Sequence, residues 1–206
     1  QSHRTMSKYA WMKKKKPRGW ELIEDSLEEY EAKMKEAVAD PHEGRRKCES
    51  NWMVHRIHYE KNRFMYDLHY KEKKISKELY QFLIDNKIAD PGLHSKWKKP
   101  GYETVCSLQS VRTGDHNFAT TSICRVPLAK RQDRVGPCQA TGCISCASGD
   151  GGPIWWDEFD KAMEVAKKKK KKEGGGGGGG GGKRGRDDSD DEDPEFAERL
   201  KRLKGM

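Results

Sequence analysis

The stretch CQATGCISC, residues 138–146, contains three of the chain's six cysteines: Cys138, Cys143 and Cys146. Two more, Cys106 and Cys124, precede it. The spacers around the last three thiols are short and rich in glycine, serine and threonine, which lets several thiolates converge on one tetrahedral ion at about 2.3 Å. The pattern predicts a cysteine-rich module of the zinc type over residues 101–150, built from loops and short strands.

The metal hypothesis is one structural zinc ion bound by four of these thiols, namely Cys138, Cys143 and Cys146 with either Cys106 or Cys124. The alternative is a loop of thiols that folds against partners without any metal. His116 is a weaker candidate, because a single histidine in a loop is more often a surface residue. Cys48 lies far from the cluster in sequence and is interpreted as a packing residue.

Composition limits the size of any single core. Of 206 residues, 33% are hydrophobic and 36% are charged, and domains short of apolar side chains commonly add a metal or a partner surface. The net charge of +9 favours RNA or DNA as a partner, although basic charge is also a common solubility device.

The sequence shows neither an apolar run of the roughly 20 residues that span a membrane nor a secretory signal. We therefore expect a reducing compartment, where clustered cysteines bind metal rather than form disulfides.

Residues 20–100 are predicted to form a basic helical domain. Ser26 and Glu29 fit a capping box, which predicts that the first helix begins after Ser26. Helical spacing then gives this helix one apolar face, made of Leu27, Tyr30, Met34 and Val38.

A long second helix is predicted from Pro41 to about Lys74, because Asp40 followed by Pro41 is typical of a helix start. It carries two apolar stripes, one of Trp52, Tyr59, Tyr66 and Tyr70 and one of Val54, Ile57, Phe64 and Leu68. A helix that is apolar on two faces is surrounded by other material. The interpretation stays open between a core helix with long basic side chains at its edges and a helix clamped between protein partners and RNA.

Arginine, lysine and tyrosine interleaved on one element suit phosphate contact and base stacking. The candidate RNA-binding residues are Arg45, Arg46, Lys47, Arg56, Arg63, Lys96, Lys98 and Lys99.

Two shorter helices are expected after the long one, the first capped by Ser76 and the second beginning at Asp90-Pro91 and ending near Lys99. Trp97 is expected to pack inside this domain.

The two ends of the chain are predicted to be low in regular structure. Residues 1–19 form a basic tail that suits nuclear import or phosphate binding, or is a solvated disordered tail. Residues 151–206 are a low-complexity extension with a short amphipathic helix around residues 155–165, then lysine and glycine runs, an acidic block at 187–193 and a short terminal helix from Pro194. The predicted fold is therefore mainly α: a helical N-terminal part with one long helix, then the small cysteine-rich module, with disordered tails.

An enzyme is the competing class. The sequence has no nucleophile elbow, no HExxH, and no glycine loop in the strand–turn–helix setting that cradles phosphates. A redox role for Cys143 and Cys146 would need a thioredoxin-like βαβ pattern, which is missing. We expect no enzymatic activity. A zinc-containing transcription or chromatin cofactor is the remaining alternative, and a base-reading helix beside the cysteines would favour it.

Five motifs resemble, in order and nearly without gaps, the bud-site-selection family of spliceosomal, zinc-binding pre-mRNA splicing factors, also called the G-ten family. They are GWELIE (19–24), DPHEGRRK (40–47), ISKELY (75–80), KWKKPGYE (96–103) and ICRVP (123–127). The resemblance covers roughly residues 17–150. Motifs of this length in register are far more specific than a single CxxC pair.

The resemblance implies a nuclear, non-enzymatic splicing factor that lies near the RNA catalytic centre of the spliceosome. It implies spliceosomal scaffold proteins, small nuclear RNA and pre-mRNA as partners, with one copy of the chain per complex. It implies neither a membrane nor a small-molecule substrate. A mostly helical fold with a cysteine-rich, zinc-binding C-terminal part belongs to the same expectation.

The chain departs from the family pattern within the cysteine-rich part. The family usually has cysteine where this chain has Ser107, Ser110, Ser122 and Thr141, and histidine where it has Ala140. Hydroxyl groups are poor zinc ligands at neutral pH, so the family's multi-zinc cluster does not carry over intact. Five thiols suffice for one tetrahedral site but not for three.

Overall fold

A computed structural model describes residues 14–41, 43–131 and 135–174 of the chain. The described part is mainly helical, with the clustered cysteines in its C-terminal region. The predictions for the first thirteen residues, for most of the glycine run, for the acidic block and for the terminal helix lie outside the described residues.

The first helix, α1, spans Glu24–Ala39 and begins earlier than the capping box predicted. A 3₁₀ turn at Trp20–Leu22 leads into it, and the residue before it, Ile23, makes no side-chain cap. Ser26 therefore lies inside the helix rather than at its cap. Glu24 and Asp25 in the first turn interact favourably with the positive end of the helix dipole. The predicted apolar face is wrong at its end, because Val38 is 66% exposed while its neighbour Ala37 is buried.

The second helix, α2, spans Trp52–Tyr66 and is shorter than the predicted Pro41–Lys74. A 3₁₀ turn at Glu49–Asn51 precedes it, and π-helical turns at Asp67–Lys71 follow it. Asp40 is extended, as residues before proline usually are, and ends α1 instead of starting α2. Gly44 then has a φ of 76°, a left-handed conformation that interrupts any helix there.

The two shorter helices confirm their predicted caps. In α3, Lys77–Asp85, the Ser76 hydroxyl accepts a hydrogen bond from the Leu79 amide at 3.2 Å. In α4, Pro91–Trp97, Asp90 Oδ1 accepts from the amides of Gly92 and Leu93 at 2.9 and 3.2 Å. Each cap satisfies amides that have no partner within their own helix.

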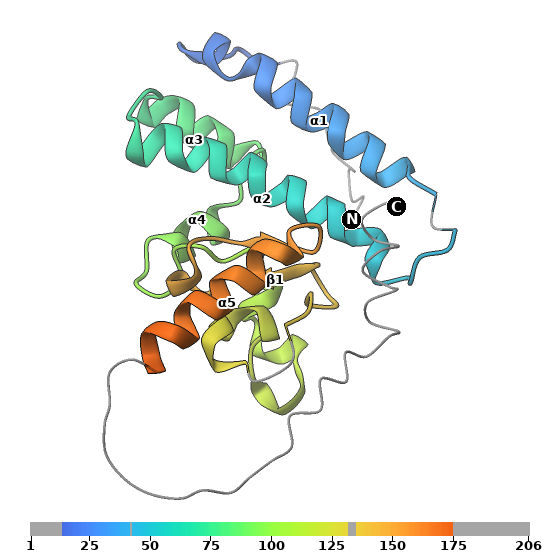
Figure 1. Cartoon of the computed structure of the whole chain (residues 1–206). Coiled ribbons are helices and arrows are strands. Elements are labelled where there is room, and N and C mark those ends of the chain that lie inside the picture. Colours follow the sequence, from blue (N-terminus) through green and yellow to red (C-terminus); the bar gives the residue numbers. More distant parts are fainter. Residues whose placement is uncertain (1–13, 42, 132–134, 175–206) are drawn as a thin grey trace, which may run out of the picture.

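α2 crosses the middle of the molecule, between α1 and α3 on one side and the cysteine-containing segment on the other (Figure 1). α2 and the π-helical turns after it contribute side chains to two different cores. Trp52 and Tyr59 join a cluster with the cysteines, whereas Met65 and Leu68 join a cluster with Leu27, Leu79 and Leu83. The helix is therefore surrounded by the chain's own elements, as its double stripe indicated.

His94 on α4 ties three helices together. Its Nδ1 lies 2.7 Å from the Tyr80 hydroxyl on α3, and its Nε2 lies 3.1 Å from the backbone carbonyl of Asn62 on α2. Asn62 Oδ1 in turn accepts from the Asp90 amide at 2.7 Å. The Asn62 carbonyl can only accept, so His94 Nε2 donates to it, and in the neutral imidazole Nδ1 then accepts from the Tyr80 hydroxyl.

Beyond Asp150 the described chain continues to pack on the cysteine-containing segment. Strand β1, Cys143–Ser145, pairs antiparallel with β2, Ile154–Trp155. Helix α5, Phe159–Gly174, places Ala162 and Ala166 against Leu128, Ile144 and Ile154 in a third core cluster. The amphipathic helix expected at 155–165 thus begins later, since Trp155 lies in β2.

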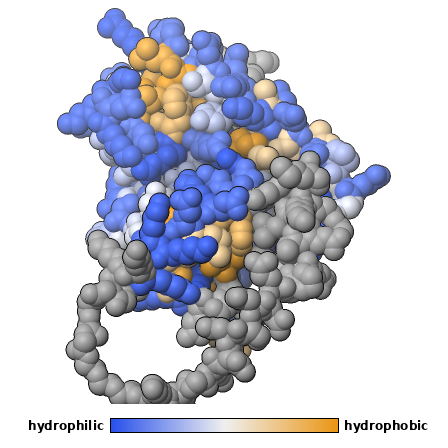
Figure 2. Space-filling model, viewed as in Figure 1, coloured by the Kyte–Doolittle hydropathy of each residue, from blue (hydrophilic) through white to orange (hydrophobic). Residues whose placement is uncertain are grey.

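Most of the surface seen in Figure 2 is hydrophilic, with apolar side chains in separate patches, one of them where α1 and α3 lie. Within the described residues, no helix is both long and apolar enough to cross a membrane.

His94 predicts a pH dependence of folding. Burial, only partly offset by the hydrogen bond to Asn62, lowers the pKa of His94 to about 4 from an ordinary 6.5. Between these values the unfolded chain binds a proton that the folded chain does not. Stability should therefore fall as pH drops from 6.5 to 4, by at most roughly 3 kcal/mol from this residue.

Urea unfolding at several pH values, for the parent chain and for His94→Gln, measures this contribution. The variant should lose much of the slope between pH 6.5 and 4. A residual slope is expected because burial also lowers the pKa of His55 and His58. An identical slope in both proteins would contradict the assignment.

Candidate metal centre

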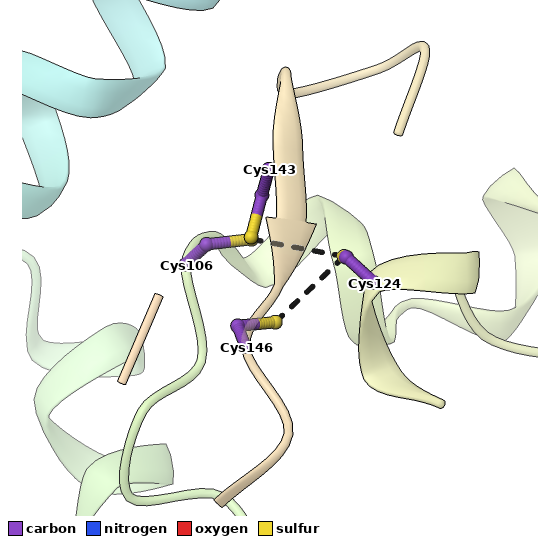
Figure 3. Close-up of side chains that lie close together, drawn as sticks. All are labelled: Cys106, Cys124, Cys143 and Cys146. Carbon is purple, nitrogen blue, oxygen red and sulfur yellow. Dashed lines mark hydrogen bonds between the residues drawn. The ribbon is translucent and has the colours of Figure 1, made fainter. Parts of the chain in front are cut away.

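Four buried thiols converge from separate parts of the chain (Figure 3). Cys106 comes from the loop after α4, Cys124 from a 3₁₀ turn at Ile123–Arg125, Cys143 from β1 and Cys146 from the residue after β1. The four sulfur atoms all lie within 4.8 Å of one another. Cys124 Sγ lies 4.0 Å from Cys106 Sγ and 3.7 Å from Cys146 Sγ.

Backbone hydrogen bonds shape the loops that carry these thiols. The Cys138 amide donates to the Cys143 carbonyl at 2.9 Å, and the Gly142 amide donates to the Cys138 carbonyl at 2.8 Å. The Cys146 amide donates to the Cys124 carbonyl at 2.9 Å. Gly142 has a φ of 72°, which a residue with a side chain rarely adopts. The glycine therefore permits the tight turn that brings Cys143 back to the cluster.

The donor set fits a tetrahedral ion. Zinc–thiolate bonds of about 2.3 Å place the four sulfurs about 3.8 Å apart, and the two distances at Cys124 bracket that value. Each thiol is buried, so water does not compete for these positions. Four buried cysteines this close together could bind a metal ion.

The thiol pKa values in the cluster move in opposite directions, raised at Cys124 and Cys143 and lowered at Cys146. Hydrogen bonds with neighbouring thiols, first with Cys106, raise the pKa of Cys124 well above its usual value. Burial opposes ionisation of Cys146, but hydrogen bonds from the other thiols and the charge of Arg125 outweigh it and lower its pKa. The thiolate at Cys146 is the form that a metal ion requires.

Cys138 lies outside this group of four, so the predicted combination of Cys138 with Cys143 and Cys146 is not the one that the structure brings together. Its sulfur lies 3.2 Å from the Ser122 hydroxyl. A hydrogen bond with Cys124, opposed by burial, lowers the pKa of Cys138 to about 5. Cys106 and Cys124, the two alternatives for the fourth ligand, are both in the group. Spacing in sequence did not distinguish a set of four that contains Cys138 from the set that the structure brings together.

His116 is not part of the group either, since its Nε2 lies 3.0 Å from the Gln109 carbonyl and 3.2 Å from the Ser122 hydroxyl. Two of the hydroxyl residues interspersed with the cysteines lie beside a thiol or in a turn. Thr141 Oγ1 is 3.7 Å from Cys106 Sγ, and Ser110 donates to the Ser107 carbonyl at 2.7 Å. These buried hydroxyls have hydrogen-bond partners within the chain.

Aromatic rings enclose the cysteine cluster. Trp52, Tyr59, Trp97, Trp155 and Trp156 belong to the same core cluster as the thiols. Trp52 Nε1 donates to the Gln139 carbonyl at 2.8 Å, and Trp97 Nε1 donates to the Val105 carbonyl at 2.9 Å. The rings thus both shield the thiols and hold the loops that carry them.

Sequence reasoning missed the buried polar contacts that join this module to α5. Asp150 accepts from the Leu128 amide at 2.9 Å, from the Ser145 hydroxyl at 2.6 Å and from Lys169 Nζ at 2.9 Å. Buried Arg131 donates to the Val126 and Ile144 carbonyls. Only spatial neighbours identify these residues, because each contact spans five or more positions in sequence and matches no motif.

Two candidate RNA-binding arginines have partners within the chain. Arg56 pairs with Glu60 and Asp157, at 3.0 and 2.5 Å, and lies over the Trp156 ring. Arg63 donates to the Glu103 carbonyl at 2.9 Å and lies over Trp97, with its Cζ 5.2 Å from the ring centroid. Arg63 connects α2 to the cysteine-rich module and Arg56 connects α2 to the segment after β2, so both side chains are engaged within the chain.

The other candidates lie nearer to solvent. Arg45 and Arg46 pair with acidic neighbours in the turns before α2, and Lys47 beside them is exposed. Lys98 and Lys99 are exposed at the end of α4. Lys96 Nζ and Arg125 Cζ lie 5.2 and 5.3 Å from the centroid of the Tyr102 ring, which is 37% exposed.

The fold is a mainly helical scaffold around a buried cluster of four thiols that could hold a metal ion. Comparison with known proteins identifies the family. The family model described as "Pre-mRNA-splicing factor BUD31" matches residues 4–148. The chain therefore belongs to the BUD31 family.

Curated relatives agree with this assignment. "Protein BUD31 homolog 2" of Oryza sativa subsp. japonica is 54% identical over 145 residues, which are 70% of this chain and 100% of the relative. "Pre-mRNA-splicing factor cwf14" of Schizosaccharomyces pombe is 39% identical, over 66% of this chain and 94% of the relative. "Pre-mRNA-splicing factor BUD31" of Saccharomyces cerevisiae is 35% identical, over 65% and 92%. The relatives support a role in pre-mRNA splicing, and with it an association with the spliceosome.

Gly142→Ala tests the close packing around the centre. An added Cβ would lie 2.6 Å from Trp52 Cγ and 2.7 Å from Trp156 Cε3, and the φ of 72° adds backbone strain. We expect a loss of about 2–4 kcal/mol in the free energy of unfolding, measured by urea denaturation.

Gly151→Ala is the matched control. Its φ is also positive, at 89°, but nothing lies within 4 Å of the added Cβ. This variant should lose only about 1 kcal/mol, from strain alone. Equal losses in the two variants would show that the tryptophan contacts do not constrain Gly142.

Proposed function

We propose that this chain is a nuclear, non-enzymatic structural component of the spliceosome that bridges scaffold proteins and RNA near the catalytic centre. Membership of the BUD31 family carries this proposal. The side chains add support: the buried thiols are packed for structure, and the surface is basic, with a net charge of +9. A basic surface favours binding to an RNA-containing assembly, because contacts with phosphates supply much of the affinity for nucleic acid.

Zinc is the ion we propose for the four-thiol centre. Cys106, Cys124, Cys143 and Cys146 would hold it, and an all-sulfur tetrahedral set is typical of closed structural zinc sites. Bound there, the ion would crosslink three segments, carrying Cys106, Cys124 and the Cys143–Cys146 pair, of a part that otherwise has little regular structure. Arg125, 3.5 Å from Cys146 Sγ, would balance part of the negative charge of the thiolates.

RNA contact is proposed for the exposed basic and aromatic surface that follows α4. Lys98, Lys99, Lys96, Tyr102 and Arg125 lie there, and a tyrosine between two cations can combine base stacking with phosphate contact. Arg56 and Arg63 would contribute less, since carboxylates and ring faces already engage them.

Metal analysis of the purified full chain tests the zinc centre. We expect one zinc ion per chain, and Cys124→Ser should reduce it strongly because this thiol contacts both Cys106 and Cys146. Cys138→Ser and Cys48→Ser should keep the metal. Absence of stoichiometric zinc in the parent chain would refute the zinc proposal. Equal loss in Cys138→Ser and Cys124→Ser would refute the four-ligand set.

Co-purification and crosslinking test the spliceosomal role. Tagged full-length chain should co-purify with spliceosomal proteins and small nuclear RNAs. Ultraviolet crosslinking in those complexes should join RNA to the peptide that contains Lys98 and Lys99. Crosslinks to protein alone would make this surface a scaffold contact, and failure to recover any spliceosomal component would refute the proposed function.

A further inference from the structure

The C-terminal half of α5 carries an unbroken run of six lysines, Lys167–Lys172. The run lies outside the residues 4–148 that match the family model. Before the run, lysines have carboxylates within reach: Lys161 pairs with Glu158, which directly precedes α5, at 2.9 Å. The second lysine of the run, Lys168, pairs with Glu164 at 3.2 Å. After Glu164 the sequence has no further carboxylate until Glu173. The helix therefore ends in a concentrated positive charge.

The folded module holds this helix in place. Ala162 and Ala166 are buried in a core cluster with Ile144 of β1 and Ile154 of β2. Lys169 of the run turns toward the module and contacts Asp150 Oδ1 at 2.9 Å and the Gly149 carbonyl. Lys167, Lys168 and Lys170 are exposed. The lysines are thus presented on a fixed element rather than on an isolated tail.

Helix stability alone does not account for the run. One or two cations in the last turn complement the helix dipole. Six consecutive lysines instead place like charges three and four positions apart, which destabilises a helix. A bound polyanion would relieve this repulsion, and phosphates spaced along a flexible strand can follow lysines that fan out around a helix.

We infer that the lysine-rich end of α5 binds RNA through its phosphates, as a surface additional to the region shared with the family. Among polyanions, RNA is favoured as the bound partner because homologues support a role in splicing. The chain's own acidic block, residues 187–193, is a weaker occupant. It carries six carboxylates, but Lys183, Arg184 and Arg186 directly precede it and offset part of its charge.

Salt-dependent binding of the full chain to a short fluorescent oligouridylate tests this inference. The variant Lys167→Gln, Lys168→Gln, Lys170→Gln removes three exposed charges and leaves the Lys169–Asp150 contact intact. Glutamine keeps a helix propensity close to that of lysine. The slope of log K against log salt should become shallower by about 2, and Kd at ~0.1 M salt should rise at least ~10-fold.

The control variant Lys35→Gln, Lys77→Gln, Lys87→Gln removes the same net charge from exposed lysines on other elements. It should change Kd less than ~2-fold if the α5 surface binds RNA. Equal effects in the two triple variants would overturn the inference, because only net charge would then matter.

A further full-chain variant, with Asp187, Asp188, Asp190 and Asp191 changed to asparagine, tests the acidic block. It should bind oligouridylate with a Kd within ~3-fold of the parent. If RNA binding appears only in this variant, the acidic block occupies the surface and the inference is overturned for the intact chain. The readouts involve purified protein and RNA only, so they are separable from failure of spliceosomal co-purification.

Discussion

Two opposite faces of α2 are buried at once, one against the helices α1 and α3 and the other against the cysteine-rich segment. Trp52 and Tyr59 face the thiols, while Met65 and Leu68 face the helical side. Arg56 and Arg63 then fasten the edges of the helix to Asp157 and Glu103. Because one element supplies part of both cores, the helical part and the cysteine-rich part are positioned relative to each other through α2.

The cysteine centre depends on this arrangement as much as on its own ligands. Between Cys106 and Cys146 the described residues form 3₁₀ turns and one short strand, with few backbone hydrogen bonds of regular structure. The aromatic side chains supply apolar contact, and the close approach of Trp52 and Trp156 to Gly142 leaves no room for a side chain there. A metal ion would add a covalent-like crosslink to a segment that packing already brings together.

The part of the chain beyond the family match is integrated into this module. β2 pairs with β1, and Asp150 and Lys169 join α5 to the strand that carries Cys143. Trp155 and Trp156 lie in the same cluster as the thiols. The extension therefore supplies packing to the cluster of thiols.

The sequence by itself determined the helical class, the caps at Ser76 and Asp90, a helix at α2 with apolar side chains on more than one face, and the five candidate thiols, because these follow from local spacing and side-chain chemistry. It misplaced the start of α2, where Asp40-Pro41 ends one helix instead of starting the next. Only the tertiary structure decided which four thiols converge, because Cys106 and Cys124 reach Cys143 and Cys146 through the folding of loops that no spacing encodes. The same long-range packing placed Asp150, Arg131 and α5 around the centre, since their partners are distant in sequence and adjacent only in the fold.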